Sequence, residues 1–247
     1  MERHKYLMIG CATMARECYY CAAISHNIVD VNTLEQGLHD VGEEMMSAAL
    51  QRAIDEVDAQ AYEAILLAYG LCNHGIRGLH AEIPLVIPRA HDCITLLLGS
   101  KEAYAQYFKE NPGTFYHSPG WIERAKSSLS NPSSTTRQMG LRTYEKYVEQ
   151  YGEENAKFLM SMLGDHFRNY KQVAYIDTGI PGSDLQKQEA MEWARERSLA
   201  YTEIQGSVRL MLMLMDGEWD EADILVVQPG GTVAGAYDDS IIQAIDS

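Results

Sequence analysis

Three cysteines of the sequence follow closely on apolar runs. Cys11 ends "LMIGC", Cys72 ends "LLAYGLC" and Cys93 ends "LVIPRAHDC". Thiolates are preferred ligands of zinc, cuprous copper and iron–sulfur clusters, and three thiolates at one point repel one another unless a cation lies between them. These residues therefore predict a metal site, with zinc or iron as the expected metal, an iron–sulfur cluster included.

A metal ion bound by three thiolates has a fourth coordination position. His91, His74 and Glu17 are the candidate protein ligands, and a water or a substrate is the alternative. Three protein ligands with one open position are typical of catalytic zinc, whereas four protein ligands are typical of structural zinc. An open position would activate a water or bind a substrate thiolate. We expect the open form.

Packing offers a second explanation of the same cysteines. Free cysteine is among the most buried residue types, so thiols near strand ends can simply fill a core. Each of the three cysteines lies just past its apolar run, beside glycine or polar residues, and this favours the metal site. Cys18 and Cys21 have the spacing of one helix face, and we expect core positions rather than ligand roles for them.

Glu17, His91 and Asp92 are the candidate catalytic residues near these thiols. His91 can be a ligand oriented by Asp92, but Asp92 is also a favoured N-cap for the helix expected after it. Glu17 falls on the first helix and faces either the crevice or the solvent. For His117 and His166 we expect local hydrogen bonds only.

Two glycine-rich loops form a rival site. "GLCNHGIRG", which begins with Gly70 and contains Gly75, and "QPGGTVAG", which contains Gly230 and Gly231, both come after apolar strands. That is the place of a phosphate- or dinucleotide-binding loop, but neither loop matches those patterns, so tight turns are the favoured explanation. The four glycines remain cofactor-binding candidates, because their backbone amides could hold an anionic group in the same crevice.

The elements that must position these residues alternate between strand and helix. Continuous apolar runs predict strands at 5–11, 27–32, 63–70, 84–88, 172–179, 200–204 and 223–231. Helical composition or spacing predicts helices at 12–24, 43–59, 137–151, 153–168, 183–198 and 206–217. This order predicts an α/β fold, with a predominantly parallel sheet and helices on both faces, and it allows two Rossmann-like lobes with a helical insertion. In such a sheet the three cysteine-bearing strand ends would meet at one edge.

A stretch rich in Pro, Gly, Ser and Thr interrupts this pattern at residues 111–136, where these residues punctuate the chain and break helices. We therefore divide the chain into a first α/β lobe with the cysteine strand ends (1–122), a loop and helical insertion (123–170) and a second α/β portion (171–247).

Composition limits the possible partners. The net charge is −15 and no run of lysine or arginine occurs, so neither a nucleic acid nor an anionic membrane surface is expected as a partner. The first apolar run is too short for a signal peptide or a membrane span. Five cysteines are too few and too unevenly spread for a disulfide framework. We expect a cytoplasmic protein with a small-molecule substrate.

Several motifs resemble a domain-of-unknown-function family, number 1638, found in anaerobic bacteria and methanogens. They are "GCATMARE", "YGLCNHGIRGL", "PRAHDCITLLLGS", "YHSPGW" and "GEWDEADILVVQPGGTV", which together span nearly the whole chain. Members are often encoded near corrinoid-dependent methyltransferases, so the resemblance implies anaerobic one-carbon or methylamine metabolism, with a corrinoid protein or a methyltransferase as partner. The positions that match the family motifs are Cys11, Glu17, Cys72, His91, Asp92 and Cys93.

Three functional hypotheses follow. The first is a metal-dependent transferase that moves a methyl or other group on a small molecule, because a metal-bound thiolate stays deprotonated at neutral pH and can accept such a group. The second is a non-enzymatic accessory protein that carries a metal, cluster or corrinoid to a partner methyltransferase. The third is a metal-free enzyme that binds its substrate through the glycine-rich loops.

Overall fold

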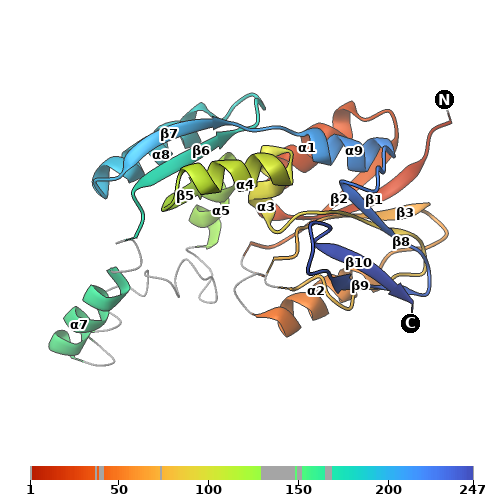
Figure 1. The fold of residues 1–247 in the computed structure, drawn as a ribbon, viewed down its shortest axis with the longest axis horizontal. Coiled ribbons are helices and arrows are strands. Elements are labelled where there is room, and N and C mark those ends of the chain that lie inside the picture. Colours follow the sequence, from red (N-terminus) through yellow and green to blue (C-terminus); the bar gives the residue numbers. More distant parts are fainter. Residues whose placement is uncertain are drawn as a thin grey trace.

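The computed structural model describes residues 2–36, 38, 42–72, 74–128, 148, 152–164 and 169–246. The strands of its largest sheet, the first sheet, are β1 (Lys5–Cys11), β2 (Ile28–Leu34), β3 (Ala64–Ala68), β4 (Leu85–Pro88) and β8 (Ile224–Val227). Their order is β2-β1-β3-β4-β8 (Figure 1). The first four strands in this order run parallel. The predicted α/β fold with a mostly parallel sheet is therefore confirmed.

β8 runs in the opposite direction to its neighbour. Leu85 of β4 pairs with Val227 of β8, and Pro88 pairs with Ile224, so the two strands are antiparallel. The end of β8 therefore lies where β4 begins, at the edge of the sheet opposite to the ends of β1, β3 and β4. A run of four apolar residues looks the same in either direction, so the sequence does not reveal this reversal.

Helices cover both faces of the first sheet. α1 (Ala15–Ile24) and α9 (Arg209–Asp216) lie on one face, and α2 (Glu43–Asp55) lies on the other face with the hairpin of β9 (Gly231–Gly235) and β10 (Ile242–Asp246) (Figure 1). α9 confirms a helix within the predicted range 206–217, and its apolar face is buried. Its buried side chains are Leu210, Met211, Leu214 and Met215.

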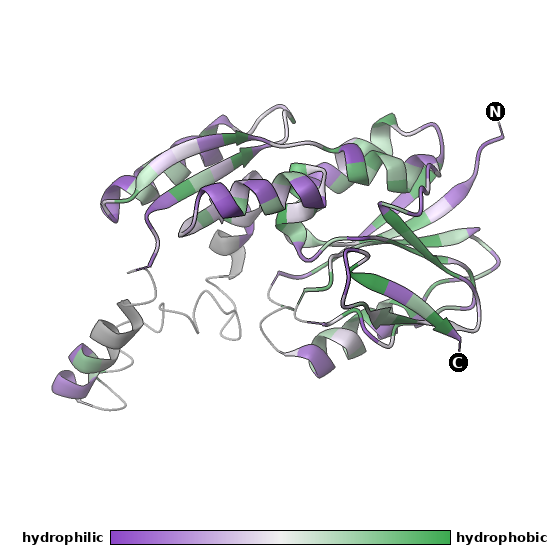
Figure 2. Cartoon of the chain, in the orientation of Figure 1, coloured by the Kyte–Doolittle hydropathy of each residue, from purple (hydrophilic) through white to green (hydrophobic). Residues whose placement is uncertain are grey.

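Each face of the first sheet has its own hydrophobic core, because successive residues of a strand point to opposite faces. In β1, Met8 packs in the core under α1 and α9, whereas Ile9 packs in the core with α2. In β3, Leu66 and Leu67 divide in the same way. Full burial of one such side chain contributes about 1.5–3 kcal/mol to stability. Figure 2 shows hydrophobic residues along these strands, in the right half of the view, and hydrophilic residues along the outer helix α4 (Lys101–Glu110).

A second sheet is built from β5 (Thr114–His117), β6 (Gln172–Asp177) and β7 (Ala200–Gln205), which run parallel in that order. α8 (Asp184–Glu196) packs on this sheet, with the ring of Trp193 stacked on Phe115 at 5.0 Å. Each sheet thus contains strands from the first α/β segment (1–122) and from the second (171–247). β5 comes before residue 122 and joins the second sheet, while β8 comes after residue 171 and joins the first.

The stretch that is rich in Pro, Gly, Ser and Thr also contains regular structure. β5 and α5 (Pro119–Ser128) lie within residues 111–136. Ser118 Oγ accepts a hydrogen bond from the Trp121 backbone N–H (3.3 Å), as an N-cap does, and Pro119 is the first residue of the helix, where proline is tolerated. Ser-Pro therefore starts a helix inside the stretch that interrupts the strand and helix pattern.

The insertion is described only in part. α7 (Glu153–Gly164) confirms a helix within the predicted range 153–168. The predicted helix at 137–151 lies, except for residue 148, outside the described residues, and so does His166. In the part of the chain that the structure covers, no helix combines the length and the apolar character needed to cross a membrane.

Candidate functional site

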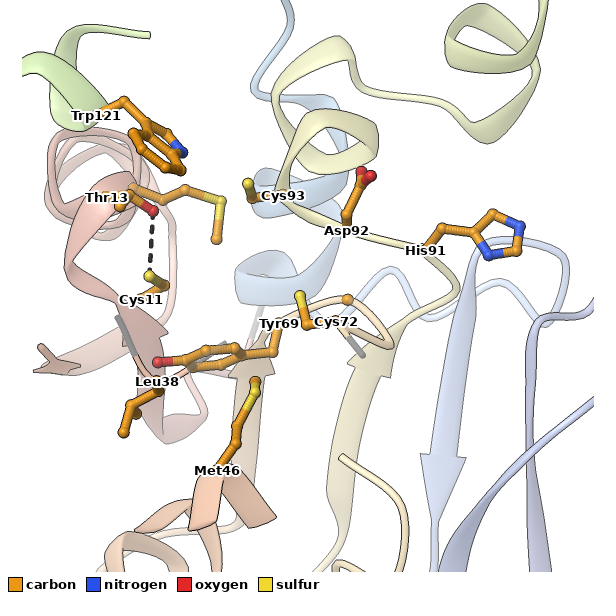
Figure 3. A pocket seen from close by; sticks show the side chains of 12 residues that line it. Cys11, Thr13, Leu38, Met46, Tyr69, Cys72, His91, Asp92, Cys93 and Trp121 are labelled. Carbon is orange, nitrogen blue, oxygen red and sulfur yellow. Dashed lines mark hydrogen bonds between the residues drawn. The ribbon is translucent and has the colours of Figure 1, made fainter. Parts of the chain in front are cut away.

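Three neighbouring strands of the first sheet end at one cavity. Cys11 is the last residue of β1, Cys72 follows β3, and Cys93 follows β4 as the first residue of α3 (Cys93–Leu98). The three cysteines line a single cavity of about 250 Å³, which we call the thiol pocket (Figure 3). The parallel topology has thus brought together residues that are far apart in the sequence, as expected. A metal-binding role for them remains a prediction.

The other walls of the thiol pocket are largely apolar or aromatic. They are formed by Thr13, Met14, Leu38, Met46, Tyr69, Gly70, His91, Asp92 and Trp121. The described lining contains no lysine or arginine, so no permanently charged cation lies beside the thiols. The Tyr69 hydroxyl is buried without a hydrogen-bond partner among the described residues, and Thr13 Oγ1 donates to Cys11 Sγ (3.1 Å).

The backbone around Cys72 is held close to the segment after β4. The Cys72 N–H donates to the carbonyl of His91 (2.9 Å). Gly70 is required at this approach, because a Cβ atom there would lie 2.6 Å from the backbone nitrogen of Asp92. Cys72 itself has φ 40°, a left-handed conformation that costs a residue with a Cβ atom about 1–2 kcal/mol. Strain of this kind is concentrated at functional sites.

Asp92 and His91 have different surroundings. Asp92 is the N-cap of α3, since its Oδ1 accepts from the Thr95 backbone N–H (3.1 Å), and the N-cap interpretation is confirmed. His91 is exposed, and Figure 3 shows its imidazole directed away from the three thiols. His74, the other histidine considered as a fourth ligand, is exposed and does not belong to the cavity lining.

Burial keeps the thiols of Cys72 and Cys93 protonated. It raises the pKa of Cys72 to about 12, with Asp92 as the next largest cause. It also raises the pKa of Cys93 well above its ordinary value, and the nearby Cys72, Asp92 and Cys11 raise it further. These effects arise because the thiols lie within electrostatic range of one another, so removing the protons of Cys72 and Cys93 at neutral pH would require a compensating cation.

The chemical type of these side chains suits a soft metal ion. Cysteine sulfur is the preferred ligand of zinc and of iron–sulfur clusters, and three of the five free cysteines face one cavity. No three His, Cys, Asp or Glu side chains of the described residues are grouped closely enough to hold a metal ion as they stand. A metal held here would therefore have to draw the thiols together as it displaces their protons.

Glu17 lies in a different environment from the pocket. It is in the first turn of α1, only 2% exposed, and outside the cavity lining, so its carboxyl faces neither the crevice nor the solvent. Its Oε1 accepts from Thr178 Oγ1 (3.0 Å), while its Oε2 has no hydrogen-bond partner among the described residues. Burial raises the pKa of this carboxyl, which favours its neutral form.

Cys18 and Cys21 are the buried neighbours of Glu17 on α1. Both are 0% exposed and belong to the core between α1, α9 and the first sheet, so their expected core positions are confirmed. Burial, followed by the charge of Glu17, raises the pKa of Cys21 to about 12 and raises that of Cys18 as well. We refer to Glu17, Cys18 and Cys21 as the α1 core group.

The two glycine-rich loops do not share one crevice. Gly75 packs against α2, where an added Cβ atom would lie 2.3 Å from Met46 Sδ. Gly230, with φ 89°, and Gly231 form the turn from β8 to β9. The expectation that this turn could line the same crevice is wrong, because the antiparallel β8 ends at the opposite edge of the sheet. A cofactor-binding role for the four glycines remains a prediction.

Trp121 and Tyr69 are two of the wall residues that the sequence interpretation missed. Tyr69 ends the apolar run that precedes Cys72 and could have been included with that strand end. Trp121 comes from α5, 28 residues after Cys93, and no local signal connects it with the thiols. The Ser-Pro helix start before Trp121 was the available signal for its helix, although it does not indicate where that helix packs.

Comparison with known proteins gives a family but no activity. No curated protein and no solved structure matches the chain. A family model described as a protein of unknown function (DUF1638) matches residues 33–215, a range that includes Cys72, Cys93 and Trp121. Because the match covers most of the sequence, the chain belongs to this family.

Proposed function

We propose that Cys11, Cys72 and Cys93 bind one zinc or iron ion, or an iron–sulfur cluster, and that the protein is a transferase acting on a small molecule. The observation that carries the proposal is the arrival of these three thiols in one cavity from three adjacent strand ends. Packing alone gives no reason for three sulfur atoms to face a cavity, whereas thiolate ligation of a metal does.

The strained backbone at Cys72 supports the same proposal. A glycine at this position would be free of the cost of φ 40°, yet the chain has a cysteine. The thiol therefore offers something that offsets about 1–2 kcal/mol of backbone strain. A role as metal ligand or reactive group accounts for this, since strained residues are typical of such sites.

The chain's own residues would perform four tasks in this transferase. The three thiols would hold the metal, and the Thr13 hydroxyl would orient Cys11 through the hydrogen bond to its sulfur. The apolar wall, with Met14 and Met46, would keep bulk water from the transferred group. Asp92 would fix the start of α3 and thereby the position of Cys93. The metal, when bound, would supply deprotonated thiolates and an open coordination position at neutral pH.

A methyl group or a similarly small group is the transferred unit that we propose. The cavity volume of about 250 Å³ lies below the range of about 300–1,000 Å³ that is usual for drug-sized ligands, and this favours a small substrate. The five unpaired cysteines are consistent with a reducing compartment, and we place the activity in the cytoplasm.

The second candidate is an accessory protein that delivers a metal, a cluster or a corrinoid to a partner methyltransferase. The exposure of His91 at the rim of the thiol pocket favours it, because a partner could reach that imidazole. Turnover of a small molecule by the isolated chain, with no partner recovered with it, would exclude this candidate.

Metal analysis of anaerobically purified protein tests the first proposal. We expect close to one equivalent of zinc or iron in the wild type, and less than about 0.2 equivalents in Cys72→Ser, since loss of one of three ligands removes specific occupancy. Cys21→Ala is the matched control, because it removes a thiol from the α1 core group and should retain the metal. A wild type with less than about 0.2 equivalents of every transition metal, unchanged in Cys72→Ser, would overturn the proposal.

A further inference from the structure

One wall of the thiol pocket comes from a different part of the fold. Trp121 is on α5, which follows β5 of the second sheet, whereas the three cysteines come from the first sheet. Figure 3 shows the Trp121 side chain on the same side of the cavity as Thr13, facing the space in front of Cys93. The pocket is thus completed only where the two sheets meet.

Close backbone packing fixes the start of α5 against the residues after β1. Gly120 lies so near η1 (Ala12–Met14) that a Cβ atom on it would be 1.9 Å from the carbonyl oxygen of Thr13. Only glycine allows this approach, because the neighbouring atom belongs to the backbone and has no side chain to move aside. The residue next to Trp121 is therefore held within contact distance of the chain that carries Cys11.

A hydrogen-bonded ion pair holds α5 one turn further along. Arg16 Nε donates to both carboxylate oxygens of Glu123 (2.9 and 3.0 Å), and Gln186 Nε2 donates to Glu123 Oε1 (2.7 Å). The contact joins α1, α5 and α8, and both Arg16 and Glu123 are about two-thirds buried. A bidentate pair of this kind restricts orientation as well as distance. Trp121, which lies between Gly120 and Glu123, is thereby given a fixed place.

We infer that Trp121 determines the size of the small molecule that the thiol pocket admits. The indole stands in front of Cys93, and the contacts of Gly120 with Thr13 and of Glu123 with Arg16 hold the stretch of α5 that carries it. The substrate is a small molecule whose transferable group fits between the indole and the other lining residues, Met14 and Tyr69 among them. This inference rests on the proposed function in taking the thiol pocket as the substrate site, although it requires no metal.

Thiol reagents of graded size test this inference directly. The full chain, freed of metal by a chelator and kept under anaerobic conditions, is treated with methyl methanethiosulfonate or with benzyl methanethiosulfonate. Each reagent forms a mixed disulfide with a cysteine sulfur and releases methanesulfinate, so the two differ in the size of the transferred group and not in the reaction. Mass spectrometry of peptides gives the rate at each cysteine.

In the wild type we expect the benzyl reagent to modify the pocket cysteines at least about tenfold more slowly than the methyl reagent, and Trp121→Ala should largely abolish this ratio. Trp121→Phe should keep most of it, since a ring remains in place. Trp193→Ala is the matched control, because it removes an indole from α8, outside the cavity lining, and should leave the ratio unchanged.

Cys18 and Cys21 report on unfolding within the same experiment. Both are 0% exposed, so they react only if the variant opens globally. An unchanged ratio in Trp121→Ala, with Cys18 and Cys21 still protected, overturns the inference, and so does an equal loss of the ratio in Trp193→Ala. Because the ratio is measured without metal, this failure is distinguishable from failure of the proposed function, which is judged by metal content.

Discussion

The thiol pocket and the α1 core group present the same residue type in two environments. Cys18 and Cys21 are packed in the core under α1 and have no exposed surface. Cys11, Cys72 and Cys93 are half-buried, and each faces the cavity from a different strand end. Burial raises the pKa of Cys21 and of Cys72 alike, so a raised pKa does not distinguish Cys72 of the pocket from Cys21 of the core.

Access is what separates the two groups of cysteines. A thiol that is closed in by side chains on all sides can only contribute packing, whereas a thiol at a cavity can also bind or react. The backbone makes the same distinction, because Cys72 is strained while Cys18 and Cys21 lie within a regular helix. Position at the end of a parallel strand is therefore a better indication of chemistry than cysteine content or spacing.

The largest effect that separates the groups should be the pH dependence of zinc binding. Burial raises the pKa values of Cys72 and Cys93, so each of these thiols must release a proton when it becomes a ligand. The logarithm of the association constant should rise with pH, by about two to three per pH unit between pH 6 and 8. Competition with a chromophoric chelator measures this slope.

Variants from each group provide the controls for that slope. In Cys93→Ser the affinity should fall, and the slope should fall by about one if any binding remains, because one proton fewer is released. In Cys21→Ala both quantities should match those of the wild type. An equal loss of zinc affinity in Cys93→Ser and Cys21→Ala would contradict the assignment of metal binding to the thiol pocket and not to the core.

The α1 core group should affect folding stability and not metal binding. Cys18 Sγ lies 3.0 Å from the position of a Cβ atom on Gly10, so the sulfur fills tightly packed space beside β1. Cys18→Ala should lower the free energy of unfolding by about 1–2 kcal/mol, because it leaves a small cavity, while metal content stays unchanged. Urea denaturation measures the first quantity. No loss of stability would mean that the core group does not have the packing role we assign to it.

Much of this contrast could be predicted from the sequence. Apolar runs ending in Cys11, Cys72 and Cys93 indicated strand ends, and parallel topology then required these ends to meet. The spacing of Cys18 and Cys21 indicated one buried helix face. These predictions need only the periodicity of short stretches of the chain and a general rule of sheet topology. Neither requires knowledge of long-range contacts.

The remaining features depend on contacts that no local pattern contains. Arg16 and Glu123, which lock the wall of the pocket, are 107 positions apart in the chain. The direction of β8 depends on how the chain returns from the second sheet, and its four apolar residues are compatible with either direction. His91 was a sound ligand candidate by type and position, but its side-chain rotamer directs the ring away from the thiols.

Glu17 allows the α1 core group to be tested by pH. Burial raises the pKa of its carboxyl in the folded protein above the ordinary value of 4.5, so the folded state binds the proton more tightly than the unfolded state. This contribution to stability is present below that ordinary pKa and is lost as pH rises through the folded pKa. Each unit by which the pKa is raised corresponds to about 1.4 kcal/mol.

Glu17→Gln mimics the neutral carboxyl and cannot titrate. It should match the wild type in stability near pH 4 and exceed it near pH 8, with the metal content unchanged. Unfolding free energies measured by denaturant across this pH range give the comparison. Equal pH dependence in the two proteins would contradict the buried, neutral state that we assign to Glu17.

The smallest predicted effect isolates the backbone strain at Cys72 from the role of its thiol. Cys72→Ala and Cys72→Gly both lack the sulfur, and both should lose the metal. They differ in that alanine keeps the cost of φ 40°, while glycine adopts this conformation freely. After allowance for the greater entropy of glycine in the unfolded chain, Cys72→Gly should be more stable than Cys72→Ala by about 1 kcal/mol.

The corresponding pair at Cys93 is the control, because this residue begins α3 and has no left-handed backbone. There the order should reverse, with Cys93→Gly less stable than Cys93→Ala by up to about 1 kcal/mol. Thermal and urea unfolding of the four variants settle both differences. If glycine were the less stable choice at residue 72 as well, the strain at Cys72 would be absent in solution. The backbone at Cys72 would then carry no energetic cost, and it would no longer support a functional role for the Cys72 thiol.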